Sequence, residues 1–178
     1  MINLQNKSPK VLVIGDLIVD QYLWGSCERI SPEAPVQVIE VDQETKVLGG
    51  AGNVVNNLKK LGARVDIISV VGNCQISAEL LKLLSNIKVQ SKYLVTQKNR
   101  ISSKKTRIIA SQQQVVRYDR ESSDDINSKS QNAIIKTFEK IVNNYEVILL
   151  SDYGKGILTN TLTQSLIKIA KKYKKKVL

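Results

Sequence analysis

The chain has 178 residues, enough for one domain with a substantial hydrophobic core. Its hydrophobic share is 42% and its charged share 24%, as in ordinary globular proteins, and no stretch approaches the length of a membrane-spanning helix. It contains no histidine, and its two cysteines, Cys27 and Cys74, lie far apart, which argues against a structural zinc site and favours free thiols.

The formal net charge of +11 raises the question of a nucleic-acid partner. Much of this charge lies between Lys168 and Lys176, where lysines alternate with the helical apolar face of Leu162, Leu166, Ile169 and Tyr173. The aromatic share is only 4%, and no nucleic-acid recognition motif is present. We therefore expect no nucleic-acid partner, and a basic surface that suits anionic substrates.

The first segment, Met1–Lys10, is polar and leads directly into an apolar run. It lacks the hydrophobic centre of a secretory signal, so we expect a cytoplasmic protein with no membrane association. The run Val11–Ile14 predicts a strand buried on both faces of a parallel sheet. Asp16 and Asp20 follow this strand, at the edge where open α/β sheets bind their ligands; alternatively, Asp16 caps a turn and Asp20 is solvated.

Glycine and proline punctuate residues 24–35, which are predicted to be irregular. Valine and isoleucine then favour a partly buried strand over about 36–41. The sequence Gly49-Gly50-Ala51-Gly52-Asn53 opens a predicted helix whose apolar face is formed by Val54, Val55, Leu58 and Leu61, and Gly62 ends this helix. Glycines allow a backbone to approach a ligand closely, and the helix N-terminus and the Asn53 amide suit a polyol. The plain alternative is a tight loop that needs glycine for backbone reasons only.

A second buried strand is predicted over 65–71, a short helix over 76–84 and a strand over 93–95. Residues 104–119 form a predicted hairpin with a polar turn at 111–114. The hairpin is basic, with Lys104, Lys105, Arg107, Arg117 and Arg120. These cations either keep an exposed sheet edge soluble or, through Arg107 or Arg117, grip a phosphate group.

Residues 124–132 are polar and predicted to form a loop before a helix marked by Ile134, Phe138, Ile141 and Tyr145. Val147–Leu150 predicts another buried strand, which leads into Ser151-Asp152-Tyr153-Gly154-Lys155-Gly156. Here Lys155 either lies in solvent or offers its charge to a phosphate, while Asp152 orients the phosphate or meets a metal-bound water.

The spacing of Gly-Gly-Ala-x-Asn, Gly62 and Gly72 resembles the first signature of the ribokinase-like (PfkB) carbohydrate kinases. Val55 departs from it, because that position usually holds Ser, Thr or Ala. The resemblance implies an α/β fold: a three-layer αβα sandwich with a small β-lid, whose strands are those at about 36–41 and 104–119. Such exposed lid strands often pair with a second subunit, so a homodimer through the lid is expected.

Further motifs, Arg-Ile-Ser-Pro-Glu-Ala-Pro-Val at 29–36, Gln-Gln-x-x-Arg-x-Asp at 113–119 and Leu-Ser-Asp-Tyr-x-Lys-Gly at 150–156, resemble the branch of this family that phosphorylates heptose phosphates. This resemblance implies ATP-dependent phosphorylation of D-glycero-β-D-manno-heptose 7-phosphate at O1, for lipopolysaccharide core synthesis. The expected sugar-binding residues are Asp16, Asp20, Gly49, Gly50 and Asn53. The expected phosphate-binding candidates are Arg107, Arg117 and Lys155, and Asp152 is a further expected substrate-binding residue.

The family's catalytic base, the Asp of a Gly-x-Gly-Asp motif, has no counterpart in this sequence. The chain reaches Leu178 just as a new apolar strand begins, so we interpret residues 1–178 as the N-terminal portion of one kinase domain. The resemblance then implies that the base and the site for ATP and Mg²⁺ lie beyond Leu178, and that no metal is bound by residues of this segment.

Three alternatives remain open. The protein could be another sugar or nucleoside kinase of the same family, or an inactive fragment that only binds a sugar phosphate. A Rossmann dinucleotide-binding protein is disfavoured, because the Gly50-x-Gly52 pair lacks a third glycine and does not directly follow the first strand.

Overall fold

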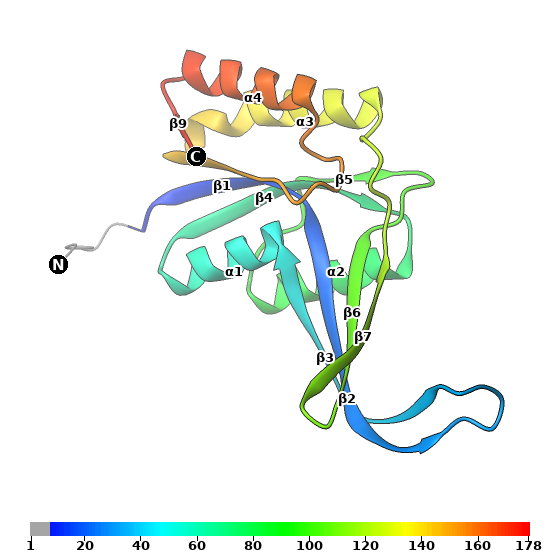
Figure 1. Cartoon of the computed structure of the whole chain (residues 1–178). Coiled ribbons are helices and arrows are strands. Elements are labelled where there is room, and N and C mark those ends of the chain that lie inside the picture. The colour runs from blue at the N-terminus through cyan, green and yellow to red at the C-terminus, as the bar shows by residue number, and fades with distance from the viewer. Residues whose placement is uncertain (1–7) are drawn as a thin grey trace.

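The computed structural model describes residues 8–178. The first seven residues, which belong to the polar Met1–Lys10 segment, lie outside the described residues. A layered body carries a second, smaller sheet that projects from it (Figure 1). Within residues 8–178, no helix combines the length and the apolar character needed to cross a bilayer.

The central sheet of the body has five parallel strands in the order β5-β4-β1-β8-β9. In chain order these strands are β1 (Lys10–Gly15), β4 (Arg64–Gly72), β5 (Leu94–Gln97), β8 (Val147–Ser151) and β9 (Lys176–Val177). The chain adds β4 and β5 on one side of β1 and β8 and β9 on the other. The direction of winding therefore reverses next to β1, and this is where open α/β sheets form their ligand-binding crevice.

Both faces of the sheet are covered, which explains why residues 11–14 of β1 are all apolar. Val11 and Val13 point into the core formed with helices α1 (Ala51–Lys60) and α2 (Gln75–Asn86). Leu12 and Ile14 point the other way, into the core formed with α3 (Ser128–Ile141) and α4 (Asn160–Lys172). The predicted three-layer αβα arrangement is confirmed (Figure 1).

The second sheet, called the lid below, has four strands in the order β3-β2-β6-β7. They are β2 (Leu17–Ile30), β3 (Gln37–Gly50), β6 (Ser103–Ala110) and β7 (Gln113–Arg120). Because only Asp16 separates β1 from β2 and β3 runs directly into α1, the lid grows out of the carboxyl edge of the central sheet (Figure 1). The chain thus links the lid covalently to the predicted ligand-binding edge.

The helix starts have clear local causes. The Asn127 side chain accepts a hydrogen bond from the Ser130 N–H at 2.8 Å, and the Thr159 hydroxyl accepts one from the Leu162 N–H at 3.1 Å. These are N-caps of α3 and α4. Helix α3 therefore begins at Ser128, inside the stretch 124–132 that was predicted to be a loop, and a short 3-10 turn, η1 (Val142–Asn144), follows it.

The lid differs from the sequence prediction in its extent. Residues 24–30 were predicted to be irregular but belong to β2, and only 31–36 turn at the tip. Gly25 was read as a strand breaker, yet it lies at a bulge where an added Cβ would come within 2.0 Å of the Glu40 carbonyl oxygen. The strand predicted over 36–41 is the beginning of the much longer β3.

Two smaller predictions also need correction. Leu61 was assigned to the apolar face of α1, but it follows the helix and is 75% exposed. The turn predicted over 111–114 consists of Ser111 and Gln112 alone, both with positive φ, since β7 starts at Gln113.

Two neighbouring leucines of α2 test this account of the core. Leu80 is fully buried, whereas Leu81 is 41% exposed. Replacing Leu80 by alanine should lower the free energy of unfolding by about 2–5 kcal/mol. Replacing Leu81 by alanine should lower it by less than about 1 kcal/mol. Urea denaturation of the full-length protein measures both, and equal losses would contradict the assignment of α2's faces.

Candidate active site

The candidate site lies where β1 and β8 end and the lid begins. Asp16 is the residue directly after β1, and Ser151 is the last residue of β8. An added Cβ on Gly15 would come within 2.0 Å of the Ser151 carbonyl oxygen, so glycine lets the two strands approach at this edge. The sequence therefore brings the first acidic motif and the Lys155 motif together.

Asp16 is fully buried, and its carboxylate holds the loop that follows β8. It accepts hydrogen bonds from the backbone N–H groups of Tyr153 at 2.8 Å, Lys155 at 3.2 Å and Ile157 at 3.3 Å. Burial raises the pKa of Asp16 above its ordinary value, against the lowering effect of these three donors. The structure thus gives Asp16 an organising role and leaves its carboxylate no exposed surface for the sugar contact expected from the sequence.

The glycine motif brings the chain from β3 to α1 immediately beside Asp16. Gly50 has a φ of +55°, and the Ala51 N–H donates to the Asp16 carbonyl oxygen at 2.9 Å. A Cβ on Gly50 would lie 2.4 Å from that same oxygen. Both the left-handed backbone and the close approach require glycine here. Asn53 is exposed in the first turn of α1, as a ligand-binding amide must be.

Asp20 lies on β2 of the lid and pairs with Arg107 of β6, with 2.6 Å between Oδ1 and Nη1. Arg107 also lies over the ring of Tyr22, 5.2 Å from its centre, and the Asp20 carboxylate raises the pKa of Arg107. The second oxygen of Asp20 lies against Gly49, where an added Cβ would approach it to 2.1 Å. A partly exposed carboxylate is thereby held beside the glycine motif.

The loop after β8 carries the other predicted residues. The exposed Asp152 accepts a hydrogen bond from the Gly154 N–H at 2.8 Å and so shapes the turn. The ammonium of Lys155 donates to Glu121 Oε1 at 2.6 Å, and its carbonyl oxygen accepts from the Arg100 guanidinium. Glu121 and Arg100 join the lid to this loop.

The basic residues of the hairpin do not form one cluster. Lys105 lies opposite Asp119, and Arg107 opposite Arg117, whose exposed side chain bonds Asp119 at 3.1 Å. Strand alternation sends Lys104 to the other face of the lid, where its ammonium lies 3.2 Å from Glu79 of α2. A pocket of about 410 Å³ opens on that face, and Arg120 lines it.

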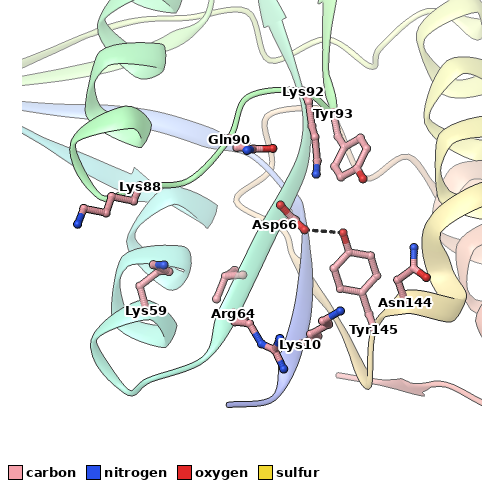
Figure 2. A pocket seen from close by; sticks show the side chains of 11 residues that line it. Lys10, Lys59, Arg64, Asp66, Lys88, Gln90, Lys92, Tyr93, Asn144 and Tyr145 are labelled. Carbon is pink, nitrogen blue, oxygen red and sulfur yellow. Dashed lines mark hydrogen bonds between the residues drawn. The ribbon is translucent and has the colours of Figure 1, made fainter.

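A pocket of about 420 Å³ lies at the opposite end of the central sheet, at the amino ends of β1 and β4 (Figure 2). Five basic residues line it: Lys10, Lys59, Arg64, Lys88 and Lys92. In the same pocket the Tyr145 hydroxyl donates to Asp66 Oδ2 at 2.7 Å. Because ligands of open α/β sheets bind beyond the carboxyl ends of the strands, we place the candidate site at the other end.

The described residues do not offer a ready metal site. In the range 8–178, no three carboxylate or thiol side chains gather closely enough to hold an ion. Asp16 is surrounded by backbone donors, which bind anions rather than cations.

Arg100, Glu121 and Tyr22 were not singled out from the sequence. Arg100 follows a turn and Glu121 ends the hairpin, so no local periodicity marks either residue. Both act across more than 30 positions, on Lys155, and only the fold reveals such contacts. Tyr22 lies in the part of β2 next to the stretch predicted to be irregular, which hid its place opposite Arg107.

Comparison with known proteins decides the family. Residues 8–178 match the model of the pfkB family carbohydrate kinases. The chain belongs to this family. Two relatives named "Bifunctional protein HldE" are similar over nearly the whole chain: that of Aliarcobacter butzleri is 58% identical over 97% of it, and that of Sulfurimonas denitrificans 50% identical over 98%. The chain spans 36% and 37% of their lengths, respectively.

Solved structures of related fold agree with the layered architecture. The Arabidopsis thaliana ribokinase, crystallised with ribose and ATP, superposes with a TM-score of 0.62 at 15% identity, over 96% of this chain and 53% of that one. A structure described as a putative phosphofructokinase from Staphylococcus aureus gives a TM-score of 0.70 at 11% identity, over 94% of this chain and 51% of that one. This similarity confirms the ribokinase-like fold.

The buried position of Asp16 predicts a specific pH dependence. Its pKa is raised in the folded protein above the ordinary 3.8, so the unfolded chain loses this proton at a lower pH than the folded protein does. The stability contributed by Asp16 should therefore be greatest at low pH and fall as the pH rises through the folded-state pKa. Urea denaturation of wild type and Asp16→Asn between about pH 4 and pH 7 measures this. The free energy of unfolding of the wild type should fall relative to that of Asp16→Asn as the pH rises. A difference in unfolding free energy that stays constant with pH would show that burial does not raise the pKa of Asp16.

Proposed function

We propose that the full-length protein transfers the γ-phosphoryl group of ATP to O1 of D-glycero-β-D-manno-heptose 7-phosphate, in the synthesis of ADP-heptose for the lipopolysaccharide core. The observation that carries the proposal is that the motifs resembling those of heptose kinases occur in a pfkB family chain. This chain is 58% identical to a bifunctional HldE protein. Residues 8–178 supply the N-terminal portion of the kinase domain, including much of the sugar site.

Sugar binding in this proposal rests on the groups around the glycine motif. Asp20 accepts hydrogen bonds from sugar hydroxyls, since its side chain is partly exposed and fixed by Arg107. Asn53 both donates and accepts from the first turn of α1. Gly49 and Gly50 allow the sugar to lie close to the backbone, and Asp16 holds this edge together from beneath.

Phosphate binding rests on Lys155 and Arg107, with Asp152 shaping the turn between β8 and Lys155. Arg117 is a more distant candidate at the exposed end of the lid, where its guanidinium bonds Asp119. ATP and Mg²⁺ supply the phosphoryl group and neutralise its charge. The nucleotide site and the aspartate base belong to the remainder of the kinase domain in this proposal.

We further propose a cytoplasmic homodimer that pairs through the lid. Cys27 and Cys74 are free thiols, as is usual for cytoplasmic proteins. Strand β7 is the outer strand of the lid and exposes Val115, Val116 and Tyr118, which are 42%, 46% and 53% accessible. An exposed, apolar edge strand of this kind favours pairing with a second copy.

Turnover by the full-length protein tests the main proposal. With ATP, it should convert heptose 7-phosphate to the 1,7-bisphosphate, detected by ³¹P NMR, and should use ribose, fructose 6-phosphate and adenosine poorly. Preference for one of these three substrates would reassign the protein within its family. Binding of heptose 7-phosphate without turnover would indicate a sugar-phosphate-binding protein.

Two aspartates of the lid provide a matched test of the sugar site. Replacing Asp20 by asparagine removes the charge beside Gly49 and should lower kcat/KM for the sugar about tenfold or more, since a charged hydrogen bond is lost. The exposed Asp42 on β3 is the control, and Asp42→Asn should leave kcat/KM unchanged. Equal effects of the two changes would place the sugar elsewhere.

Charge placed on β7 tests the dimer. Val116→Lys should convert a dimer into a monomer, because an ammonium would be buried at the paired edge. Light scattering coupled to size-exclusion chromatography gives the mass. Leu61→Lys, at an exposed apolar position outside the lid, should leave the dimer intact. A wild-type monomer at micromolar concentration would refute pairing through the lid.

A further inference from the structure

Glu121 forms an ion pair that bridges the two parts of the molecule. It directly follows β7, where the lid returns to the body, and its Oε1 accepts the hydrogen bond from Lys155 Nζ at 2.6 Å. The Glu121 side chain is 18% exposed and that of Lys155 17%. Both charges are thus largely withdrawn from solvent, at the edge where the candidate site lies.

The backbone of Lys155 is fixed on both sides. Its N–H donates to Asp16 Oδ2 at 3.2 Å, and its carbonyl oxygen accepts a hydrogen bond from Arg100. Arg100 is 6% exposed and also donates to the Asp124 carbonyl oxygen at 2.9 Å. Only the Lys155 side chain can then change its position without breaking this network, and Glu121 determines where its ammonium lies.

Both members of the ion pair lack hydrogen-bond partners for some of their polar atoms. An ammonium has three donors, and within residues 8–178 the Lys155 ammonium has one hydrogen-bonding partner, Glu121. Glu121 Oε2 is buried and has no hydrogen-bond donor among the described residues. An unpartnered, buried carboxylate oxygen is unfavourable for folding, so stability alone does not account for a glutamate at this position.

We propose that Glu121 is a positioning residue, which holds the Lys155 ammonium where its two remaining donors can bind a phosphate group of a substrate. This inference rests on the proposed kinase function but concerns a residue outside the sugar-binding motifs. The phosphate belongs either to the sugar phosphate or to the nucleotide. Glu121 itself does not contact the phosphate, because two anions would repel each other; it acts through Lys155.

A simpler role, in which the ion pair merely fastens the lid to the body, makes a different prediction. Loss of such a fastening would alter the binding of every ligand under the lid, with or without a phosphate group. Loss of positioning would affect phosphate-bearing ligands alone. Buried ion pairs often contribute little net stability, so thermal stability alone does not separate the two roles.

The test uses the full-length protein with Glu121→Ala, Glu121→Gln and, as a control, Glu139→Gln on the exposed surface of α3. Glutamine keeps an oxygen that can accept the Lys155 hydrogen bond. Glu121→Ala should raise KM for one phosphate-bearing substrate roughly tenfold or more, with a smaller change in kcat, and Glu121→Gln should restore most of the loss. Glu139→Gln should behave as wild type.

The arms of the experiment distinguish the sources of the phosphate. A rise in KM for heptose 7-phosphate assigns Lys155 to the sugar phosphate, and a rise in KM for ATP assigns it to the nucleotide. Calorimetric titration with the unphosphorylated heptose should give the same affinity in wild type and Glu121→Ala. An equal loss of affinity for phosphorylated and unphosphorylated sugar, or unchanged KM values for both substrates, would overturn the proposal.

A second measurement keeps the inference separate from the identity of the sugar. Titration of inorganic phosphate into ¹⁵N-lysine-labelled protein should shift the Lys155 ammonium signal, which the Lys155→Gln spectrum identifies. The shift should be absent in Glu121→Ala and present in Glu121→Gln. If wild type shows this shift, Glu121→Ala lacks it and the protein does not phosphorylate the heptose, the proposed substrate fails and the role of Glu121 stands. If Glu121→Ala shows the wild-type shift, the role of Glu121 fails.

Discussion

The buried carboxylate of Asp16 is the interaction on which the site depends. The carboxylate links the loop after β8 to the end of β1 by accepting hydrogen bonds from three backbone N–H groups. The backbone carbonyl oxygen of Asp16 accepts a hydrogen bond from the first N–H of α1. Four backbone groups from two distant segments therefore converge on one residue. Burying an ionised group is unfavourable, and these donors offset that cost while fixing the segments relative to each other.

The same junction explains how a lid can grow out of the sheet without disordering the site. The lid leaves the body after Asp16 and returns through Gly49 and Gly50, whose backbones approach Asp20 and Asp16 too closely for any side chain. On its other side, Arg100 and Glu121 bind the loop around Lys155. At its base the lid contributes Leu17, Val19 and Leu48 to the apolar core of the body. Around Asp16 and Lys155 the two parts meet through polar contacts, which can change when a ligand binds more readily than that apolar core can.

The sequence was sufficient for the body of the fold but only in part for the site. Continuous apolar runs such as Val11–Ile14 and the helical spacing of apolar residues around Leu80 indicate directly which residues are buried. The glycine motif identified the family. Strand β2 was not predicted, because its polar alternation and the glycine at its bulge resemble a loop until β3 and β6 are in place. Asp16 was correctly placed at the strand end, yet its burial and the Glu121–Lys155 pair depend on contacts across long sequence separations, which no local pattern encodes.

The most direct test of the central claim is a crystal structure of the full-length protein with heptose 7-phosphate. The sugar hydroxyls should lie against Asp20 and Asn53, with Asp16 still bonded to the backbone N–H of Lys155. A heptose bound instead in the basic pocket at the amino end of the sheet, beside Lys10 and Arg64, would contradict the account.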